Sequence, residues 1–155
     1  PIRRSQLITG KALAAVVNSA ALLLVTWGAT LVGGAFYEAD GDYYSFVALS
    51  MVALFILQLI FLAVGILLGS AIKRYKQAGS IAIFLLLGTF FLSIMIGMND
   101  KLSSLKVLTP FKYFDAAAIF HQSKLDMPYV GLSAVIVIVC MIGAYWAYAK
   151  RDLYI

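Results

Sequence analysis

The side chains best suited to chemistry in this sequence are polar groups that interrupt long apolar runs. Two are amides, Asn18 and Gln58, and the others are hydroxyls: Ser19, Thr26, Thr30, Thr89, Ser93 and Ser133. An amide in apolar surroundings needs a hydrogen-bond partner or a polar cavity. Asn18 and Gln58 are therefore candidates either for a hydrogen bond between helices, which we favour, or for the wall of a transport pathway.

No group of side chains suited to catalysis or metal binding can be assembled from the sequence. His121 is the single histidine and Cys140 the single cysteine, which excludes a disulfide and a metal cluster built from these residues. The long apolar runs contain no Asp or Glu, the groups that proton-coupled carriers use inside a membrane. A glycine-rich phosphate loop of the G-x-x-x-x-G-K-[ST] type is also absent from the sequence. We expect no enzyme activity, no cofactor and no metal, so that any ATP hydrolysis occurs in a separate partner subunit.

The elements that position these residues are helices that cross a membrane. The 155 residues are 63% hydrophobic and 12% charged, a composition that a soluble domain of this length cannot hide in one core. A spanning helix needs about 20 mostly apolar residues, and four runs qualify: 10–36, 45–72, 77–98 and 128–149. The sequence predicts an all-α fold, a polytopic transmembrane helical bundle with four spans plus a short outer amphipathic helix, in one transmembrane domain.

The charged residues predict how the bundle is oriented. Eight basic residues fall on one side: Arg3, Arg4, Lys11, Lys73, Arg74, Lys76, Lys150 and Arg151. The other side holds six acidic residues and four lysines: Glu38, Asp40, Asp42, Asp100, Asp115, Asp126, Lys101, Lys106, Lys112 and Lys124. Because cytoplasmic loops carry the excess of Lys and Arg, we expect both ends of this segment in the cytoplasm and the chain in the cell membrane. The formal charge of +5 then reflects topology, and we expect no nucleic-acid partner.

The segment 101–126, between the third and fourth runs, is longer than a simple connector requires. Thr109 followed by Pro110 predicts a helix start, with the Thr hydroxyl as the cap and Pro in the first helical position. Phe111, Phe114, Ala118 and Gln122 then share one face of a short amphipathic helix. Pro110, Phe111 and Phe114 are candidates for an outer gate, and the alternative is that these aromatic rings simply cover the ends of the spans.

Gly65 and Gly69 form a small-xxx-small pair in the second apolar run. Such pairs allow another helix to approach closely. We interpret the pair as a packing signal with little functional specificity.

Three short motifs occur in a fixed order along the chain. They are residues 1–11 (Pro-Ile-Arg-Arg-Ser-Gln-Leu-Ile-Thr-Gly-Lys), 108–114 (Leu-Thr-Pro-Phe-Lys-Tyr-Phe) and 150–153 (Lys-Arg-Asp-Leu). Together the motifs resemble the membrane-spanning permease subunit of type-2 ATP-binding-cassette (ABC) exporters, the ABC-2 family of transporter proteins. In that family the first motif precedes a span on the cytoplasmic side, the second begins the outer helical segment, and the third lies just inside the membrane.

This resemblance implies an ABC exporter permease that forms the transmembrane pathway. Its implied partners are a cytoplasmic ATP-binding-cassette ATPase subunit and a second permease copy or paralogue, in addition to membrane lipid. Family members typically have six spans, so the resemblance and the first residue, Pro1, lead us to expect the C-terminal four spans of a longer permease. Arg3, Arg4 and Lys11 would lie near the ATPase-coupling contact, and each is equally well explained as a membrane anchor.

Two other functions remain open on the sequence. A small four-span secondary carrier suits the length but lacks an acidic residue within its spans. A non-transporting membrane scaffold or assembly factor is the other alternative, and purification without an ATPase would favour it.

Overall fold

The structure is a computed structural model that describes residues 4–72, 75–98, 100–122 and 124–150. Its four long helices are α1 (Arg4–Phe36), α2 (Gly41–Ala71), α3 (Tyr75–Met98) and α5 (Met127–Ala149). Three short helices lie between α3 and α5: the 3₁₀ helices η1 (Asp100–Leu108) and η2 (Pro110–Lys112), followed by α4 (Ala116–Gln122). The four long helices are each long and apolar enough to cross a membrane. The prediction of an all-α polytopic bundle is confirmed.

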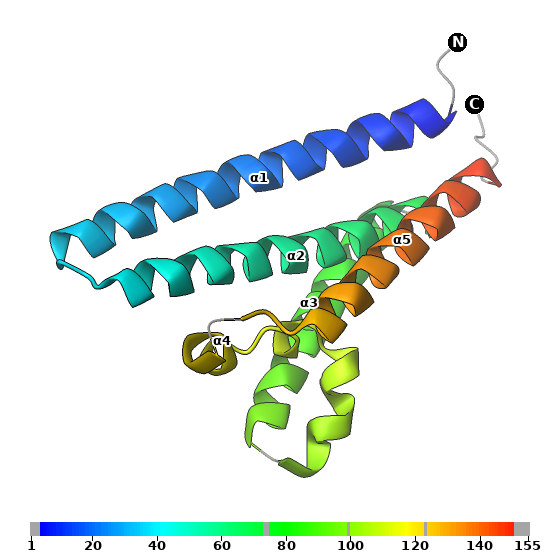
Figure 1. Cartoon of the computed structure of the whole chain (residues 1–155). Coiled ribbons are helices and arrows are strands. Elements are labelled where there is room, and N and C mark those ends of the chain that lie inside the picture. The colour runs from blue at the N-terminus through cyan, green and yellow to red at the C-terminus, as the bar shows by residue number, and fades with distance from the viewer. Residues whose placement is uncertain (1–3, 73–74, 99, 123, 151–155) are drawn as a thin grey trace.

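The described ends of the chain lie on the same side of the bundle (Figure 1). α1 leads away from that side, α2 returns to it, α3 leads away again, and α5 returns. We call this side the terminus side and the opposite one the far side. The α1–α2 turn and the short helices η1, η2 and α4 lie on the far side (Figure 1). We call residues 100–126 the far-side segment.

α1 and α2 form an antiparallel hairpin that closes very tightly at its turn. Gly34 is buried, and a methyl group built there would come within 2.5 Å of the Tyr43 ring. The Tyr43 hydroxyl donates a hydrogen bond to the backbone carbonyl of Thr30 at 3.3 Å. In the turn itself, Glu38 has a φ of 49°, in the left-handed region that residues other than Gly adopt infrequently. The absence of a side chain at position 34 therefore sets how closely the two helices approach.

α2 is the centre of the bundle because α1, α3 and α5 all contact it. Its most extensive interface is with α5, and the buried positions on these two helices are mostly small: Ala53, Ala63, Ser70, Ser133 and Ala144. Gly143 of α5 faces Leu67 of α2 so closely that an added methyl group would lie 3.1 Å from its Cδ1. Small residues let membrane helices approach closely.

The expectation that Gly65 and Gly69 mark a close helix approach is wrong within this chain. A methyl group built at either position meets no atom within 4 Å. The small-xxx-small spacing gives an approach only where a second helix lies against that face, and here the neighbours of α2 pack against other faces.

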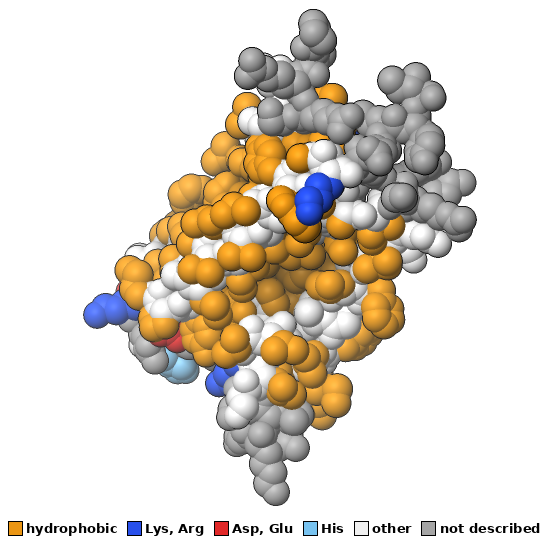
Figure 2. Space-filling view, turned by 90° about the vertical axis from the view of Figure 1, so that its right-hand side faces the viewer, with side chains coloured by type: hydrophobic (Ala, Val, Ile, Leu, Met, Phe, Trp, Pro, Cys, Tyr) orange, Lys and Arg blue, Asp and Glu red, His pale blue; other side chains and the backbone are white. Residues whose placement is uncertain are grey.

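Large apolar side chains cover the flanks of the bundle between its two ends (Figure 2). On α3, for example, Phe84 is 78% exposed and Phe91 is 60% exposed. On α1, Leu24 is 62% exposed. Exposed apolar surface of this extent belongs in lipid or against another apolar helix. The protein is a multi-pass membrane protein.

The far-side segment differs from the single amphipathic helix predicted to begin at Thr109. Pro110 does occupy the first position of η2, but η2 ends at Lys112, and α4 begins only at Ala116. Thr109 makes no capping hydrogen bond with its side chain. Its hydroxyl donates backwards to the carbonyl of Lys106 at 3.3 Å. The capping prediction is wrong because the hydroxyl closes η1 instead of opening the next helix.

Candidate functional site

Phe111 is the point at which the far-side segment enters the bundle. Its ring lies 5.1 Å from the ring of Phe61 on α2 and 5.5 Å from the ring of Phe90 on α3, measured between centroids. Pro110, next to it, is buried. Aromatic pairs at such distances stabilise an interface beyond their burial. The candidate outer-gate residue Phe111 therefore lies as a wedge between two spanning helices.

Tyr113 joins the far-side segment to the start of α5. Its ring stacks on that of Tyr129 with 5.1 Å between centroids and 18° between planes, and its hydroxyl donates to the carbonyl of Val107. The side chain is 3% exposed. Burial, together with the nearby Tyr129, raises the pKa of Tyr113 above its ordinary value of 10. The phenol is therefore held in its neutral form.

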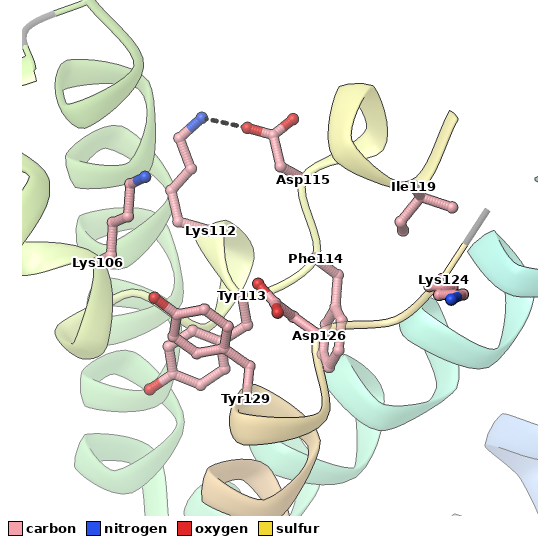
Figure 3. Close-up of a pocket in the computed structure, with 9 residues that line it drawn as sticks. All are labelled: Lys106, Lys112, Tyr113, Phe114, Asp115, Ile119, Lys124, Asp126 and Tyr129. Atoms are coloured by element: carbon pink, nitrogen blue, oxygen red, sulfur yellow. Dashed lines mark hydrogen bonds and ion pairs between the residues drawn. The ribbon is translucent and has the colours of Figure 1, made fainter. Parts of the chain in front are cut away.

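A charged cavity of about 200 Å³ lies beside this tyrosine pair (Figure 3). Its wall contains Lys106, Lys112, Tyr113, Phe114, Asp115, Ile119, Lys124, Asp126 and Tyr129. Lys112 and Asp115 form an ion pair with 3.0 Å between Nζ and Oδ2. The lining thus brings three ammonium groups and two carboxylates, a formal +1, to one hollow.

An apolar cavity of about 140 Å³ lies on the α2 side of the same segment. It is lined by Ser50, Ala53, Leu54, Leu57, Pro110, Phe111, Phe114, Ala116 and Ile119. Phe114 and Ile119 belong to both cavities. All three candidate gate residues, Pro110, Phe111 and Phe114, therefore contribute to this apolar wall.

Five of the six candidate hydroxyls inside the spans are satisfied by their own helix. Each donates to a carbonyl three or four residues earlier: Thr26 to Leu22, Thr30 to Thr26, Thr89 to Leu85 and Leu86, Ser93 to Phe90, and Ser133 to Tyr129. Such bonds satisfy a side chain without linking helices.

Three buried polar atoms have no partner within the described part of the chain: Nε1 of Trp27, Oγ of Ser50 and Oε1 of Gln58. They lie on the two helices of the α1–α2 hairpin. Asn18, the other candidate amide, is exposed on α1. Unpaired buried polar groups are infrequent in native structures and mark places where water, a ligand or another chain belongs. Of the two candidates, Gln58 has this property and Asn18 faces the surroundings of the bundle.

On the terminus side, a side-chain hydrogen bond joins the first and last helices. The hydroxyls of Thr9 on α1 and Tyr145 on α5 lie 2.7 Å apart. Lys11, one of the candidate coupling residues, is exposed two residues later. Arg3 lies outside the described residues, and the structure describes Arg4 only as the first residue of α1. Thr9 therefore connects the segment expected to contact an ATPase with the last span.

The arrangement is that of a membrane component, and comparison with known proteins identifies its family. The model of the family described as "ABC-2 family transporter protein" matches residues 1–153. The chain belongs to the ABC-2 transporter family. No curated protein and no solved structure matches it. This ABC-2 protein is thus a transmembrane component of ABC transport, and the suspected resemblance is confirmed.

Some features of this ABC-2 protein were not predicted from its sequence. Trp27 and Ser50 were not singled out, because an indole and a hydroxyl in an apolar run usually find partners. Tyr113 lies within the far-side segment and Tyr129 lies just after it, and only the return of the chain to α5 brings their rings together. The positive charge of the cavity was also not predictable, because its lysines come from separate parts of the segment and only the folded chain brings them to one cavity.

Proposed function

We propose that this chain is a permease subunit of an ATP-driven ABC exporter that forms the transmembrane pathway and couples to a separate cytoplasmic ATPase. The observation that carries the proposal is the family match, which extends over residues 1–153. ABC-2 permeases are transmembrane components that normally work with an ATP-binding subunit. The absence of Asp and Glu from the apolar runs supports an external energy source, because such a subunit needs no charged relay of its own.

In this proposal the terminus side faces the cytoplasm, and the chain lies in the cell membrane. The basic residues support this orientation, since Lys11 and Lys150 both lie at this end of the bundle. Lys150 also places its ammonium 3.7 Å from the centre of the Trp146 ring, an arrangement suited to the membrane interface, where both side chains are favoured.

Arg3, Arg4 and Lys11 form the coupling contact in this mechanism. A displacement of the start of α1 by the ATPase is passed to α5 through the Thr9–Tyr145 hydrogen bond. At the far side, Pro110, Phe111 and Phe114 act as the gate, because the Phe111 wedge must leave its position between Phe61 and Phe90 when α2 and α3 separate. Such a rocking motion of packed helices is a common form of alternating access.

The pathway itself is completed by a second permease copy or a paralogue. Gln58 and the exposed Asn18 are the polar groups assigned to the pathway or to contacts between helices. A methyl group built at Gly65 would meet no described atom within 4 Å, and this space supports a further helix from outside this chain.

The test is affinity purification of the full-length natural chain from mild detergent, followed by an ATP hydrolysis assay of the material that copurifies. We expect an ATPase to copurify and to be lost in the charge-reversal variant Lys11→Glu. Lys150→Glu is the matched control, because it changes the charge on the same side of the membrane by the same amount. A preparation free of ATPase would overturn the exporter proposal, and equal losses in both variants would overturn the assignment of the contact to Lys11.

A further inference from the structure

One exposed face of α1 follows a repeat of seven residues. Its positions are separated alternately by four and three residues, which is the heptad spacing by which two helices pack along one line. All six positions are exposed: Asn18, Val25 and Val32, which are a positions of the heptad, and Ala14, Ala21 and Gly28, which are d positions. We call these six residues the α1 seam.

The α1 seam points away from the rest of the described bundle. α1 lies at an outer edge of the bundle (Figure 1), and within the described residues its contacts are mainly with α2 and α5. The buried residues of α1, which include Ile8, Ala12 and Gly34, fall outside the heptad positions of the seam. Val25 is 71% exposed and Val32 is 57% exposed. The seam is therefore accessible to another helix along its whole length.

Asn18 places an amide on this face at the depth of the hydrocarbon. It lies seven residues, about 10 Å, beyond Lys11 and sixteen residues, about 24 Å, before Gly34 at the hairpin turn. Its side chain is exposed and makes no hydrogen bond to the described residues. Lipid chains offer an amide neither a donor nor an acceptor, so its exposure to them is costly. The partner that covers the seam must supply both at this level.

A second copy of this chain supplies both. Two copies inserted in the same orientation are related by a two-fold axis along the membrane normal, so their α1 helices run parallel and each seam residue meets its own equivalent. An amide is a donor and an acceptor at once, and two Asn18 side chains across the axis can therefore bond to each other. In parallel two-stranded seams, β-branched residues such as Val25 and Val32 suit the a positions, and a single Asn there fixes the register.

The remaining seam positions fit the same arrangement. The d residues Ala14, Ala21 and Gly28 are small, which lets two membrane helices approach closely. Lys11 lies on the same face one turn before the seam, and its long side chain carries the ammonium to the headgroup level, where water surrounds the charge. From Ala14 to Val32 the seam extends over eighteen residues, about 27 Å, which is close to the hydrocarbon thickness of about 30 Å.

We propose that α1 pairs with α1 of a second, identical copy along the α1 seam, with the two Asn18 amides bonded to each other at the two-fold axis. This inference rests on the proposed function, in which a second permease copy or a paralogue completes the assembly, and it names the surface that the partner covers. The pairing selects an identical copy, because a paralogue without an amide at this level leaves Asn18 unpaired.

The test is disulfide cross-linking of the full-length natural chain in its membrane, with its native cysteines, Cys140 included, replaced by alanine. On oxidation with copper phenanthroline we expect a product of twice the mass of the chain for Val25→Cys and for Ala21→Cys. Thr26→Cys is the matched control, because it is exposed at the same depth but lies outside the seam. Equal cross-linking at Thr26→Cys, no dimer at either seam position, or a product with a different protein would overturn the proposal.

The Asn18 bond is tested by energy transfer between donor-labelled and acceptor-labelled copies diluted in lipid vesicles. Asn18→Ala should weaken their association about three- to fifteenfold, the range that one hydrogen bond between membrane helices contributes. Asn18→Gln should keep the association, because it retains an amide. Thr26→Val, which removes a polar group outside the seam, should leave the association unchanged. An Asn18→Ala variant that associates as well as the natural chain would overturn the amide pairing.

The outcomes separate this inference from the exporter proposal. A copurifying ATPase without a cross-link at the seam would overturn the α1 pairing and leave the exporter proposal intact. A cross-link at the seam without an ATPase would do the reverse.

Discussion

Gly34 is the position where the structure sets the narrowest limit on side-chain size, and it gives the most direct test of the fold. A methyl group there would lie 2.5 Å from Cε1 of Tyr43, with Cδ1 and Cζ of the same ring at 3.2 and 3.3 Å. We expect Gly34→Ala to destabilise the α1–α2 hairpin. An aromatic ring has few ways to yield, because it turns about only two side-chain bonds.

The size of the effect follows from the distance that the ring must move. To restore an ordinary contact of 3.4 Å from 2.5 Å, the Tyr43 ring must retreat by 0.9 Å. The hydroxyl moves with it, and its 3.3 Å hydrogen bond to the Thr30 carbonyl is lost. Overfilling a packed site typically costs about 1–3 kcal/mol, and a hydrogen bond between membrane helices contributes about 0.6 kcal/mol. We expect the free energy of unfolding to fall by about 1–3 kcal/mol.

The matched control is Gly33→Ala, because a methyl group at that neighbouring position meets nothing within 4 Å. Membrane helices remain helical in the unfolded reference state, so the difference in helix propensity between Gly and Ala largely cancels. The assay is equilibrium unfolding in mixed micelles of mild detergent and SDS, with tryptophan fluorescence as the signal, since Trp27 lies on α1. Equal stabilities of the two variants would refute the reasoning, as would a Gly34→Ala cost that persists when Tyr43→Ala has removed the ring.

Three other predictions follow from contacts elsewhere in the structure. Thr9→Val and Tyr145→Phe should each lower the free energy of unfolding by about 0.6 kcal/mol, because each removes the hydrogen bond between these two side chains. The double variant should lose no more stability than either single variant, since the same bond is removed. Additive losses in this double-mutant cycle would contradict the prediction. Phe111→Ala should raise the rate of amide hydrogen exchange across residues 100–122, because it removes two aromatic ring pairs that each stabilise the packing by about 0.5–1.5 kcal/mol. Phe84→Ala, at an exposed position, should leave that rate unchanged. The raised pKa of Tyr113 means that the folded state favours the neutral phenol. The contribution of this phenol to stability is therefore complete below pH 10 and is lost as the pH rises through the raised pKa. Thermal unfolding measured against pH should show this alkaline loss of stability in the natural chain and a smaller loss in Tyr113→Phe.

The spanning helices could be predicted because their signal is local. A run of about 20 apolar residues has few alternatives to a helix in lipid, where each backbone polar group must be bonded within the segment. The described helices α1 to α3 and α5 therefore correspond to the four runs identified from composition. Their contacts with one another could not be obtained in this way. Gly65 and Gly69 carry the packing motif, yet the close approaches occur at Gly34 and Gly143.

The candidate sites depended on longer-range contacts and were predicted less completely. Phe111 and Phe114 were predicted to lie on one amphipathic helix, but the sequence does not reveal that η2 ends at Lys112, before Phe114. The sequence also does not reveal that the Thr109 hydroxyl bonds backwards to Lys106, which competes with capping of the next helix. Gln58 was identified by its cost of burial. The hydrogen bond between helices that we favoured for it is not made by its Oε1, which has no partner among the described residues. The coupling role of Arg3, Arg4 and Lys11 stays a prediction.

The central place of α2 has a consequence for how the protein is made. Its most extensive neighbour, α5, is synthesised later, with α3 and the far-side segment made between the two helices. At about 5–20 residues per second this interval lasts several seconds, during which the face of α2 that later contacts α5 is exposed to the membrane or the insertion machinery. The interface between α2 and α5 therefore forms only after α3 and the far-side segment have been synthesised. A nascent chain released before Met127 should remain a substrate for membrane proteases, while a chain that includes α5 escapes them.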